Sequence, residues 1–536
     1  MKVHLLYEDR EWSKKNSYFD TEAIIEDLNL GVLFKTAARN QEEQTGTVQA
    51  LGAEDKYLAE VMEQVMMVPL RSREEIIFRQ EVLKDCLAAP ELTDFLYRFS
   101  DDLIFEWDKL GRKDMRKDYR ETNGYLITRM KMLYLFLDRL AELKAYLAEN
   151  REQLHSEGFQ NLLLGLEKEF GEEDEAYLRQ LLKSLAFFCE GEDMPGVESK
   201  PLKPVLELEC TLSGGFKLEQ IWPDVVESTD KKYKKEKRQK TLSEKFLGPF
   251  AAEPSVPLKE DVVLRDLKQL EYTVVRYVMG YLEKFYLECQ DFFEQLYFQS
   301  AFYFGACRIH RRMKKMTPEI CFPKVCNKKD LFFEGLKECS MALARRMEVV
   351  GNDANIRDKM LLIVTGANQG GKSTFLRSIG IAQIMMQCGL FVSAKKYESG
   401  IFTGIYTHFT RREDVQMNSG RLDEELGRME QMLLHLEPDS LMLLNESFAT
   451  TTEQEGSEIA YDIILALLEA GVKVLTVTHL LSFAKKCYNQ EMKEAEYLSA
   501  ERLEDGERTF KMVQGEPELT SFGLDLYEEI IGEDRN

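Results

Sequence analysis

A glycine-rich segment in the last third of the chain has the residue types that bind a phosphate chain. Residues 366–374 read GANQGGKST, a full match to the pattern G-x-x-x-x-G-K-[ST]. Its glycines let consecutive backbone N–H groups point into one concavity, and a helix that begins there adds the positive end of its dipole. We expect Lys372 to contact the β and γ phosphates of ATP and the Ser373 hydroxyl to bind Mg²⁺. The predicted P-loop residues are Gly366, Gly370, Gly371, Lys372, Ser373 and Thr374.

A carboxylate follows a second apolar run, SLMLL at residues 440–444. ATP hydrolysis needs a group that orients the attacking water, and Glu446 stands where a Walker B strand presents its Asp-Glu pair. We therefore predict that Glu446 is the catalytic carboxylate. Asn445 precedes it; its amide can bind a metal-bound water, but it adds no negative charge to the Mg²⁺ site. The sequence thus leaves the hydrolysis rate open and allows a slow ATPase.

An imidazole follows a third apolar run, VKVLTV at residues 472–477, which ends in Thr478 and His479. Ligands of open α/β sheets bind at the carboxyl ends of the strands, where the P-loop and Glu446 are also expected. His479 is therefore a candidate catalytic residue that senses the γ-phosphate. The alternative is that it caps a turn, and the sequence leaves both open.

The elements that must position these residues change in character along the chain. After about Met341, short apolar strands alternate with helices, a pattern typical of a mostly parallel sheet covered by helices. Before it, long helices dominate. One apolar series comprises Leu126, Met130, Leu133, Leu137, Leu140 and Leu147; a second comprises Leu264, Leu267, Val274, Val278, Leu282, Phe285, Cys289, Phe292 and Leu296. As one helix of about forty residues, the second would be about 60 Å long and would serve as a lever or strut.

An insertion at about residues 194–257 differs from the helices around it. It is rich in proline, and residues 206–218 predict a β-hairpin that turns at Ser213, Gly214 and Gly215. It also holds a basic run of Lys231, Lys232, Lys234, Lys235, Lys237, Arg238 and Lys240. This run suits an arm lying along DNA phosphates, and a solvated loop is the alternative. A second basic stretch, residues 308–315, we interpret as a structural helix end.

The composition limits the remaining possibilities. Among 536 residues, 44% are hydrophobic and 31% charged, and no stretch is apolar enough for a membrane span or a signal peptide, so we expect a cytoplasmic protein. Ten widely spread cysteines contain no C-x-x-C pair, so neither a zinc site nor a disulfide framework is indicated. The net charge of −23 confines any DNA contact to local basic patches.

The motifs resemble those of the MutS mismatch-repair ATPases. TGANQGGKSTFLRSIG looks like their P-loop, with Asn368, Gly370 and Gly371 matching its Asn and double Gly. LMLLNESFATTTEQEG is similar to their Walker B strand, and TVTHLLSFA to their histidine switch. THFTRREDVQMNSGRLDEEL, from residue 407, resembles the stretch with their signature loop, whose serine reaches the partner's nucleotide in a dimer; Ser419 is the nearest match. VPLRSREEIIFRQEVLKDC, from residue 68, resembles the start of their helical core and lever domain.

The chain departs from that family in four respects. It begins near the helical core, so the resemblance implies a short form without the N-terminal mismatch-recognition domains. The tripeptide Phe332-Phe333-Glu334 fits the mismatch wedge of those domains only by accident of sequence. Asn445 replaces the Walker B Asp. The nuclease-like C-terminal domain of one MutS branch is also expected to be absent.

These observations predict a multidomain protein. A mainly α-helical core and lever domain at residues 1–340 is followed by an α/β ABC-type P-loop ATPase domain at residues 341–536. The resemblance implies a homodimer that sandwiches ATP with Mg²⁺ and moves helical levers to clamp DNA, as in mismatch repair or recombination. One alternative is an ABC-type ATPase that acts on a protein or ribonucleoprotein assembly, which the charge of −23 favours. Another is a nucleotide-gated scaffold that hardly hydrolyses ATP.

Overall fold

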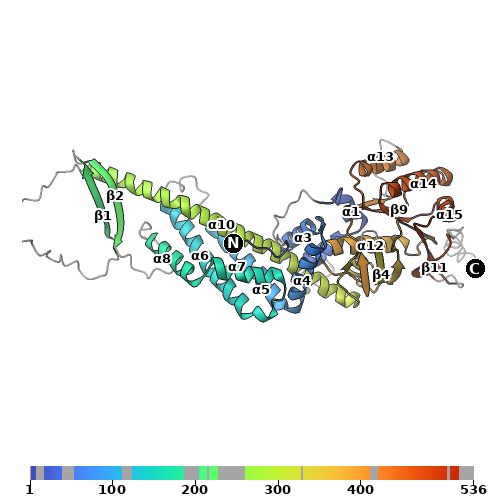
Figure 1. Cartoon of the computed structure of the whole chain (residues 1–536), viewed down its shortest axis with the longest axis horizontal. Helices are drawn as coiled ribbons and strands as arrows, with labels where there is room; N and C mark the ends of the chain where they lie inside the picture. The colour runs from blue at the N-terminus through green and yellow to red at the C-terminus, as the bar shows by residue number, and fades with distance from the viewer. Residues whose placement is uncertain are drawn as a thin grey trace, which may run out of the picture. The chain divides into compact units, whose positions relative to one another are not determined.

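The computed structural model describes residues 2–7, 17–38, 53–111, 123–185, 205–213, 217–226, 260–326, 330–410, 420–503 and 508–517 (Figure 1). The chain divides into two compact units. Unit 1 comprises Met1–Lys2, Phe99–Arg151 and Leu163–Gln295. Unit 2 comprises Val3–Arg98, Glu152–Leu162 and Leu296–Asn536. Each unit is formed by several segments that are separate in the sequence. The domain boundary expected near residue 341 stays a prediction.

Unit 1 is built from long helices. They are α5 (Pro90–Gly111), α6 (Asn123–Glu149), α7 (Glu157–Glu169), α8 (Glu172–Leu185) and α10 (Glu260–Met316), of which α5, α7 and α10 continue into unit 2. The helix predicted from the first leucine series is confirmed as α6, where Met130, Leu133, Leu137, Leu140 and Leu147 are all buried. In this core, the Trp107 ring of α5 packs edge-on against Phe136 of α6 at 4.6 Å and Tyr286 of α10 at 5.3 Å.

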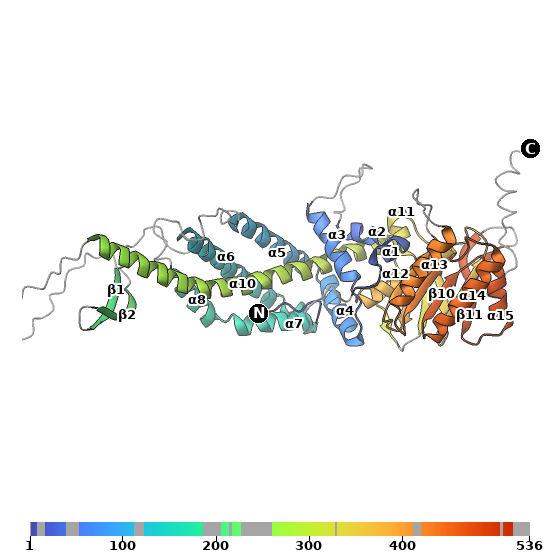
Figure 2. The same ribbon diagram turned by 90° about the horizontal axis from the view of Figure 1, so that it is seen from above.

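The second predicted helix is longer than expected. Figure 2 shows α10 as one long helix. It has 57 residues and ends at Met316, two residues before Pro318. Proline disfavours helical backbone at the residue before it, which accounts for the end of the helix. The basic stretch at residues 308–315 lies in its last turns. There Arg308 donates hydrogen bonds to the carbonyl oxygens of Ala37 and Ala38, so the structural interpretation is confirmed for this residue.

The predicted hairpin is present in the insertion. Strands β1 (Val205–Ser213) and β2 (Lys217–Val226) pair antiparallel, with Val205 opposite Val226. The turn residues Gly214 and Gly215 lie outside the described residues, as does the basic run at residues 231–240.

Unit 2 contains a six-stranded sheet in the order β12-β11-β6-β10-β9-β8. Its strands are β6 (Leu361–Gly366), β8 (Ile405–Phe409), β9 (Leu441–Asn445), β10 (Lys473–Val477), β11 (Ala495–Arg502) and β12 (Arg508–Gln514). All neighbours pair in parallel except β12, so the predicted mostly parallel sheet is confirmed. The three strands expected from the sequence are β6, β9 and β10, each within one residue of its predicted start.

Helices accompany this sheet in unit 2. They are α1 (Thr21–Asp27), α2 (Gly31–Ala38), α3 (Ala53–Met66), α4 (Arg73–Ala88), α11 (Cys339–Arg345), α12 (Lys372–Gln387), α13 (Arg421–Leu434), α14 (Glu453–Glu469) and α15 (Leu481–Asn489). Helix α12 follows the P-loop and is buried along nearly its whole length. Its Gly380 lets Leu443 of β9 and Leu28 approach so closely that an added Cβ would lie 2.7 and 2.8 Å from them.

A second sheet was not expected from the sequence. Strands β3 (Lys324–Val325), β4 (Leu331–Leu336), β5 (Asn352–Asn355) and β7 (Lys396–Ser399) form it in the order β3-β7-β4-β5. These strands are short, and β5 reads NDAN, so they lack the apolar alternation that marks a strand. Phe333 of β4 is fully buried and packs near Phe375 at a ring distance of 6.0 Å, which gives the Phe-Phe-Glu tripeptide a structural role.

Two further sequence expectations concern absences. Eight cysteines with described side chains are free thiols. No described helix combines the length and the apolar composition that a membrane crossing requires.

A buried arginine ties α4 to the end of α12. Arg79 is completely buried and donates to the carbonyl oxygens of Leu6 at 3.2 Å and Cys388 at 3.0 Å, while its guanidinium lies over the ring of Phe302. Gly389 has φ +75°, and a Cβ there would lie 2.8 Å from Arg79 Cβ. The arginine therefore satisfies a carbonyl at the C-terminal end of α12, where a positive charge also suits the helix dipole.

We expect Arg79→Met to lower the free energy of unfolding by about 2–4 kcal/mol, because two buried carbonyl groups lose their charged donor. Chemical denaturation monitored by circular dichroism measures this loss. Arg73→Met is the matched control, since Arg73 is exposed on the same helix, and its effect should stay within about 0.5 kcal/mol. Equal effects of the two substitutions would contradict the assigned role of Arg79.

Candidate nucleotide-binding site

The P-loop turns sharply between β6 and α12. Gly366 ends the strand with φ +110°, and Gly371 precedes the first helical residue with φ +89°. A Cβ on Gly366 would lie 2.8 Å from the backbone nitrogen of Ala500, and a Cβ on Gly370 would lie 2.8 Å from Ala500 Cβ. Glycine is therefore required both by the backbone angles and by the close approach of β11.

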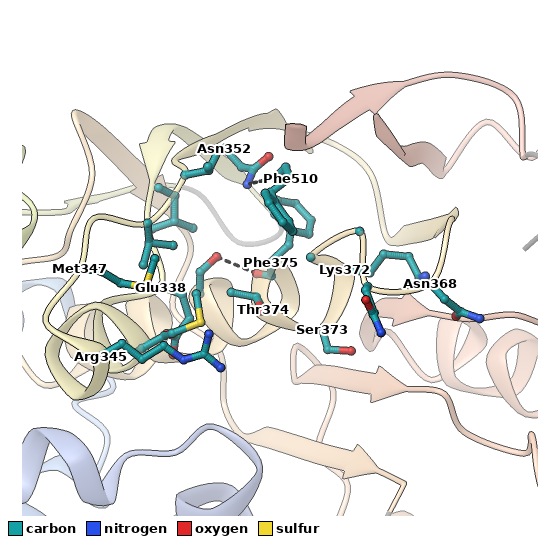
Figure 3. A pocket seen from close by; sticks show the side chains of 18 of the residues that line it. Glu338, Arg345, Met347, Asn352, Asn368, Lys372, Ser373, Thr374, Phe375 and Phe510 are labelled. Atoms are coloured by element: carbon teal, nitrogen blue, oxygen red, sulfur yellow. Dashed lines mark hydrogen bonds between the residues drawn. The ribbon is translucent and has the colours of Figure 1, made fainter. Parts of the chain in front are cut away.

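A cavity of about 630 Å³ opens over this loop. Its lining includes Asn368, Gly370, Gly371, Lys372, Ser373 and Thr374, together with Glu446 and His479. Figure 3 shows Lys372 and Asn368 on one side of the cavity and Met347 and Arg345 on the other. The structure thus gathers most of the predicted site residues around one space that is large enough for a nucleotide.

Lys372 lies within the loop itself. Its side chain is buried, and Nζ donates hydrogen bonds of 2.9 Å to the carbonyl oxygens of Gly366 and Ala367. The ammonium group is therefore held at the floor of the cavity. Two of its three N–H donors are directed at loop carbonyls.

Glu446 and His479 face each other at the strand ends. Glu446 Oε1 lies 2.9 Å from His479 Nε2, and the two side chains are 24% and 28% exposed. Val477 of β10 pairs with Asn445 of β9, so the parallel register delivers both groups at one height on the sheet. The sequence expectation that His479 and Glu446 share an edge is confirmed, while their chemical roles stay predictions.

The backbone at Glu446 is unusual. Its φ is +58°, in the left-handed region that non-glycine residues seldom adopt. The peptide is fixed on both sides, since the Glu446 nitrogen donates to Val477 O at 2.8 Å and its carbonyl accepts from the Thr410 hydroxyl at 2.9 Å. Such strained positions cluster at functional sites.

The residues fit Mg²⁺ that is held mainly by phosphates. Among the described residues, no group of three or more His, Cys, Asp or Glu side chains could hold a metal ion. Magnesium commonly takes one or two protein ligands and completes its shell with water and phosphate oxygens. Ser373 lines the cavity beside Lys372. Asn445 does not line it, although its buried Oδ1 has no hydrogen-bond partner within the described part of the chain.

Several lining residues were missed by the sequence reasoning. Met347, Val350 and Phe510 are 50%, 38% and 46% exposed, although they are apolar. Phe510 comes from β12 and is tied to β5 by a 3.2 Å hydrogen bond from Asn352 Nδ2 to its carbonyl oxygen. Exposed apolar and aromatic side chains beside a phosphate-binding loop suit a nucleotide base. No motif marks them, because they come from separate strands and loops.

Charged groups of both signs also surround the cavity. Arg345, the last residue of α11, lines the cavity, and so does Glu338, the residue before this helix. Burial raises the pKa of Glu338, which caps α11 by accepting a hydrogen bond from the Met341 nitrogen. Ser419, the predicted signature-loop residue, lies outside the described residues.

Comparison with known proteins gives matches in two parts of the chain. Residues 362–531 match the MutS domain V family, and residues 71–194 match the MutS2 N-terminal domain family. The DNA mismatch repair protein MutS of Thermotoga neapolitana is 37% identical over 135 residues, which cover 25% of this chain and 17% of that protein.

Other relatives are named endonuclease MutS2. That of Latilactobacillus sakei is 31% identical over 157 residues, covering 29% of this chain and 20% of the relative. That of Thermus thermophilus is 35% identical over 120 residues, covering 22% and 16%. The matched segments thus span a fifth or less of the length of these relatives.

We expect Gly366→Ala to lower the free energy of unfolding by about 1–3 kcal/mol. Alanine is strained at φ +110°, and its Cβ would lie 2.8 Å from the backbone nitrogen of Ala500. Thermal or urea unfolding measures the change. Gly165→Ala is the control: Gly165 lies within α7 with nothing within 4 Å of an added Cβ, so alanine should stabilise by up to about 1 kcal/mol. A tolerated Gly366→Ala would show that the loop needs no glycine there.

Proposed function

Since this chain belongs to the MutS-like family, we propose that it is an ATPase that binds MgATP at the P-loop and uses the nucleotide to control its binding to DNA. The observation that carries the proposal is the meeting of Lys372, Glu446 and His479 around one cavity. The P-loop supplies backbone donors and a cation, and the strand ends supply a carboxylate and an imidazole. A phosphate-binding loop with a lysine and a carboxylate that orients water are groups on which phosphoryl transfer to water relies.

The cavity suggests how the nucleotide lies. The triphosphate occupies the P-loop at the N-terminal end of α12, where Lys372 turns from its loop carbonyls toward the phosphate oxygens. The base lies toward the apolar side, between Phe510 and Met347, where an aromatic face can stack on it. Arg345 also lines the cavity and can pair with an acidic group of the ligand.

In hydrolysis, Glu446 accepts a hydrogen bond from the attacking water and aligns it with the γ-phosphate. His479 holds the Glu446 carboxylate through the 2.9 Å contact and lies close enough to the cavity to respond to the γ-phosphate. Mg²⁺, with Ser373 as a ligand, would neutralise charge on the β and γ oxygens. Asn445 carries no charge and does not line the cavity, so we propose that it gives the metal little support and that turnover is slow.

DNA is proposed as the partner because the similar proteins are named for DNA mismatch repair and for endonuclease activity. The basic run at residues 231–240 is the proposed contact with DNA phosphates. Because the chain has a net charge of −23, such a local run is needed to attract DNA. We also propose a homodimer in which Ser419 reaches the partner's nucleotide and long helices such as α6 and α10 transmit the nucleotide state to a DNA clamp.

Two substitutions separate ATP binding from hydrolysis. Lys372→Ala should weaken ATP affinity at least about tenfold, because it removes the positive charge that faces the phosphates. Glu446→Gln should leave ATP affinity near that of the wild type and lower kcat by about 100-fold or more. Equilibrium binding of a fluorescent ATP analogue and steady-state phosphate release measure the two effects. Wild-type turnover by Glu446→Gln would refute the catalytic assignment.

Neutralising the basic run should lower the affinity for DNA and should also reduce how strongly that affinity depends on salt concentration. Replacing Lys231, Lys234 and Lys237 by glutamine should reduce the slope of log affinity against log salt by about 0.9 for each DNA phosphate that the variant no longer neutralises. Filter binding of duplex, branched and mismatched DNA across a salt series, with and without ATP, measures both quantities. Lys314→Gln with Lys315→Gln is the control in the α10 stretch and should leave the slope unchanged. If the wild type binds none of these DNAs at low salt, the DNA-binding part of the proposal is wrong.

A further inference from the structure

The turn after β9, which carries Glu446, contains a second strained residue. Phe448 has φ +64°, so two non-glycine residues in this short turn adopt the left-handed conformation. Phe448 is also buried, and Gly456 gives its carbonyl oxygen room, since a Cβ at that glycine would lie 2.4 Å away. A bulky residue keeps such a backbone only where its surroundings hold it. The contacts around this turn therefore determine where Glu446 points.

His408 is the first of these contacts. It lies in β8, is fully buried, and places Nδ1 2.7 Å from the Ser447 hydroxyl oxygen. Its Nε2 lies 3.2 Å from the carbonyl oxygen of Glu425 on α13, and the Ser447 hydroxyl donates to the His408 carbonyl oxygen at 2.9 Å. The His408 ring also stacks on Phe448 at 5.7 Å. One imidazole thus joins the residue after Glu446 to α13.

Glu425 and Thr450 form the second contact. The Thr450 hydroxyl donates to Glu425 Oε2 at 2.7 Å, and the Glu425 side chain is buried. Helix α13 is thereby bonded to the turn on both sides of Phe448, through Ser447 and through Thr450. These four residues, His408, Ser447, Glu425 and Thr450, are called the α13 bridge below.

Few side chains of helix α13 are buried against the rest of unit 2. Of its 14 residues, Glu425, Met429 and Met432 are buried, while Leu433 and Leu434 are 44% and 71% exposed. The two methionines belong to a hydrophobic core that includes side chains of β6, β9 and β10, so they anchor α13 without the bridge. An element with few buried contacts shifts at a lower free-energy cost than one buried on all sides.

We propose that the α13 bridge positions Glu446, so that the placement of α13 determines how well this carboxylate orients water for ATP hydrolysis. The inference rests on the proposed ATPase function and assigns to it a means of regulation. When a contact displaces α13, His408 and Glu425 pass this displacement on to the turn that carries Glu446. The P-loop lies on other elements, so ATP binding does not depend on the bridge.

The experiment compares variants of the full chain in steady-state ATP hydrolysis and in equilibrium ATP binding. Thr450→Val and Ser447→Ala each remove one hydroxyl and should lower kcat at least about fivefold, while the Kd for ATP stays within about twofold. Thr450→Ser keeps the hydroxyl and should retain the wild-type kcat. Thermal unfolding midpoints should fall by no more than about 5 °C, because the methionine anchors of α13 remain.

A matched control lies at the opposite end of the same strands. The Thr403 hydroxyl donates to Pro438 O at 2.7 Å and lies 3.0 Å from Ser440 Oγ, before the N-terminal ends of β8 and β9, whereas the turn follows the C-terminal end of β9. Thr403→Val removes comparable hydrogen bonds and should leave kcat unchanged.

Three results would overturn the inference. Wild-type kcat in both Thr450→Val and Ser447→Ala, with turnover lost in Glu446→Gln, would mean that the bridge has a structural role only. Parallel losses of kcat and ATP affinity would mean that it shapes the whole cavity. Failure of Thr450→Ser to retain activity would assign the effect to packing. Wild-type turnover in Glu446→Gln itself would instead refute the proposed function on which the inference depends.

Discussion

The parallel register of β6, β10 and β9 is the constraint on which the candidate site depends. Val477 of β10 lies opposite Val364 of β6 and Asn445 of β9, so β9 and β10 end together and β6 runs two residues further, to Gly366. Parallel strands all present their carboxyl ends at one edge, and the next residues of each chain segment enter the same space. The P-loop, Glu446 and His479 meet for this reason, although more than 100 residues separate the first of them from the last. A slip of this register by one residue would also turn each strand's side chains to the opposite face.

Helix α12 connects this edge to other parts of unit 2. Its N-terminal end faces the cavity, and its C-terminal end is bonded to Arg79 of α4 and, through Gln387 O, to the Leu70 nitrogen at 2.8 Å. Along its length, Arg377 Nε donates to the carbonyl oxygen of Asp27 at the end of α1. A displacement of α12 by a bound phosphate chain would therefore act on α1 and α4 directly. Through these hydrogen bonds, a nucleotide that displaces α12 would also displace helical segments within unit 2.

Non-glycine residues with positive φ lie on both sides of the candidate site. Glu446 and Phe448 have positive φ, and the same turn is held by the Thr410 hydroxyl, by His408 and by Glu425. On the proposed binding side, Gln369 of the P-loop has φ +59° and Phe510 has φ +58°, while Gly366 and Gly371 adopt positive φ with little strain. The proposed phosphate-binding loop thus relies on backbone groups, whereas the proposed catalytic carboxylate depends on side-chain contacts from a neighbouring strand and helix. Regulation is easier to impose on the second arrangement, because it has more removable contacts.

The amino-acid sequence by itself determined the local features. The P-loop follows from glycine spacing, α6 from the apolar period of its leucines, and β6, β9 and β10 from apolar runs that only a buried strand can satisfy. Glu446 and His479 could be named because each directly follows such a run. These signals are local: they depend on residues close together in the chain and on the conformations available to each.

Only the tertiary structure showed the features that depend on contacts between segments far apart in the sequence. The sheet of β3, β4, β5 and β7 has strands too short and too polar to show a period, and Phe510 reaches the cavity only because β12 pairs with β11 beside the P-loop. His408 and Thr450 lie 42 residues apart and meet through Glu425 on a third element. No spacing rule connects such residues, because their proximity is set by strand order and helix packing rather than by the backbone geometry of any one segment.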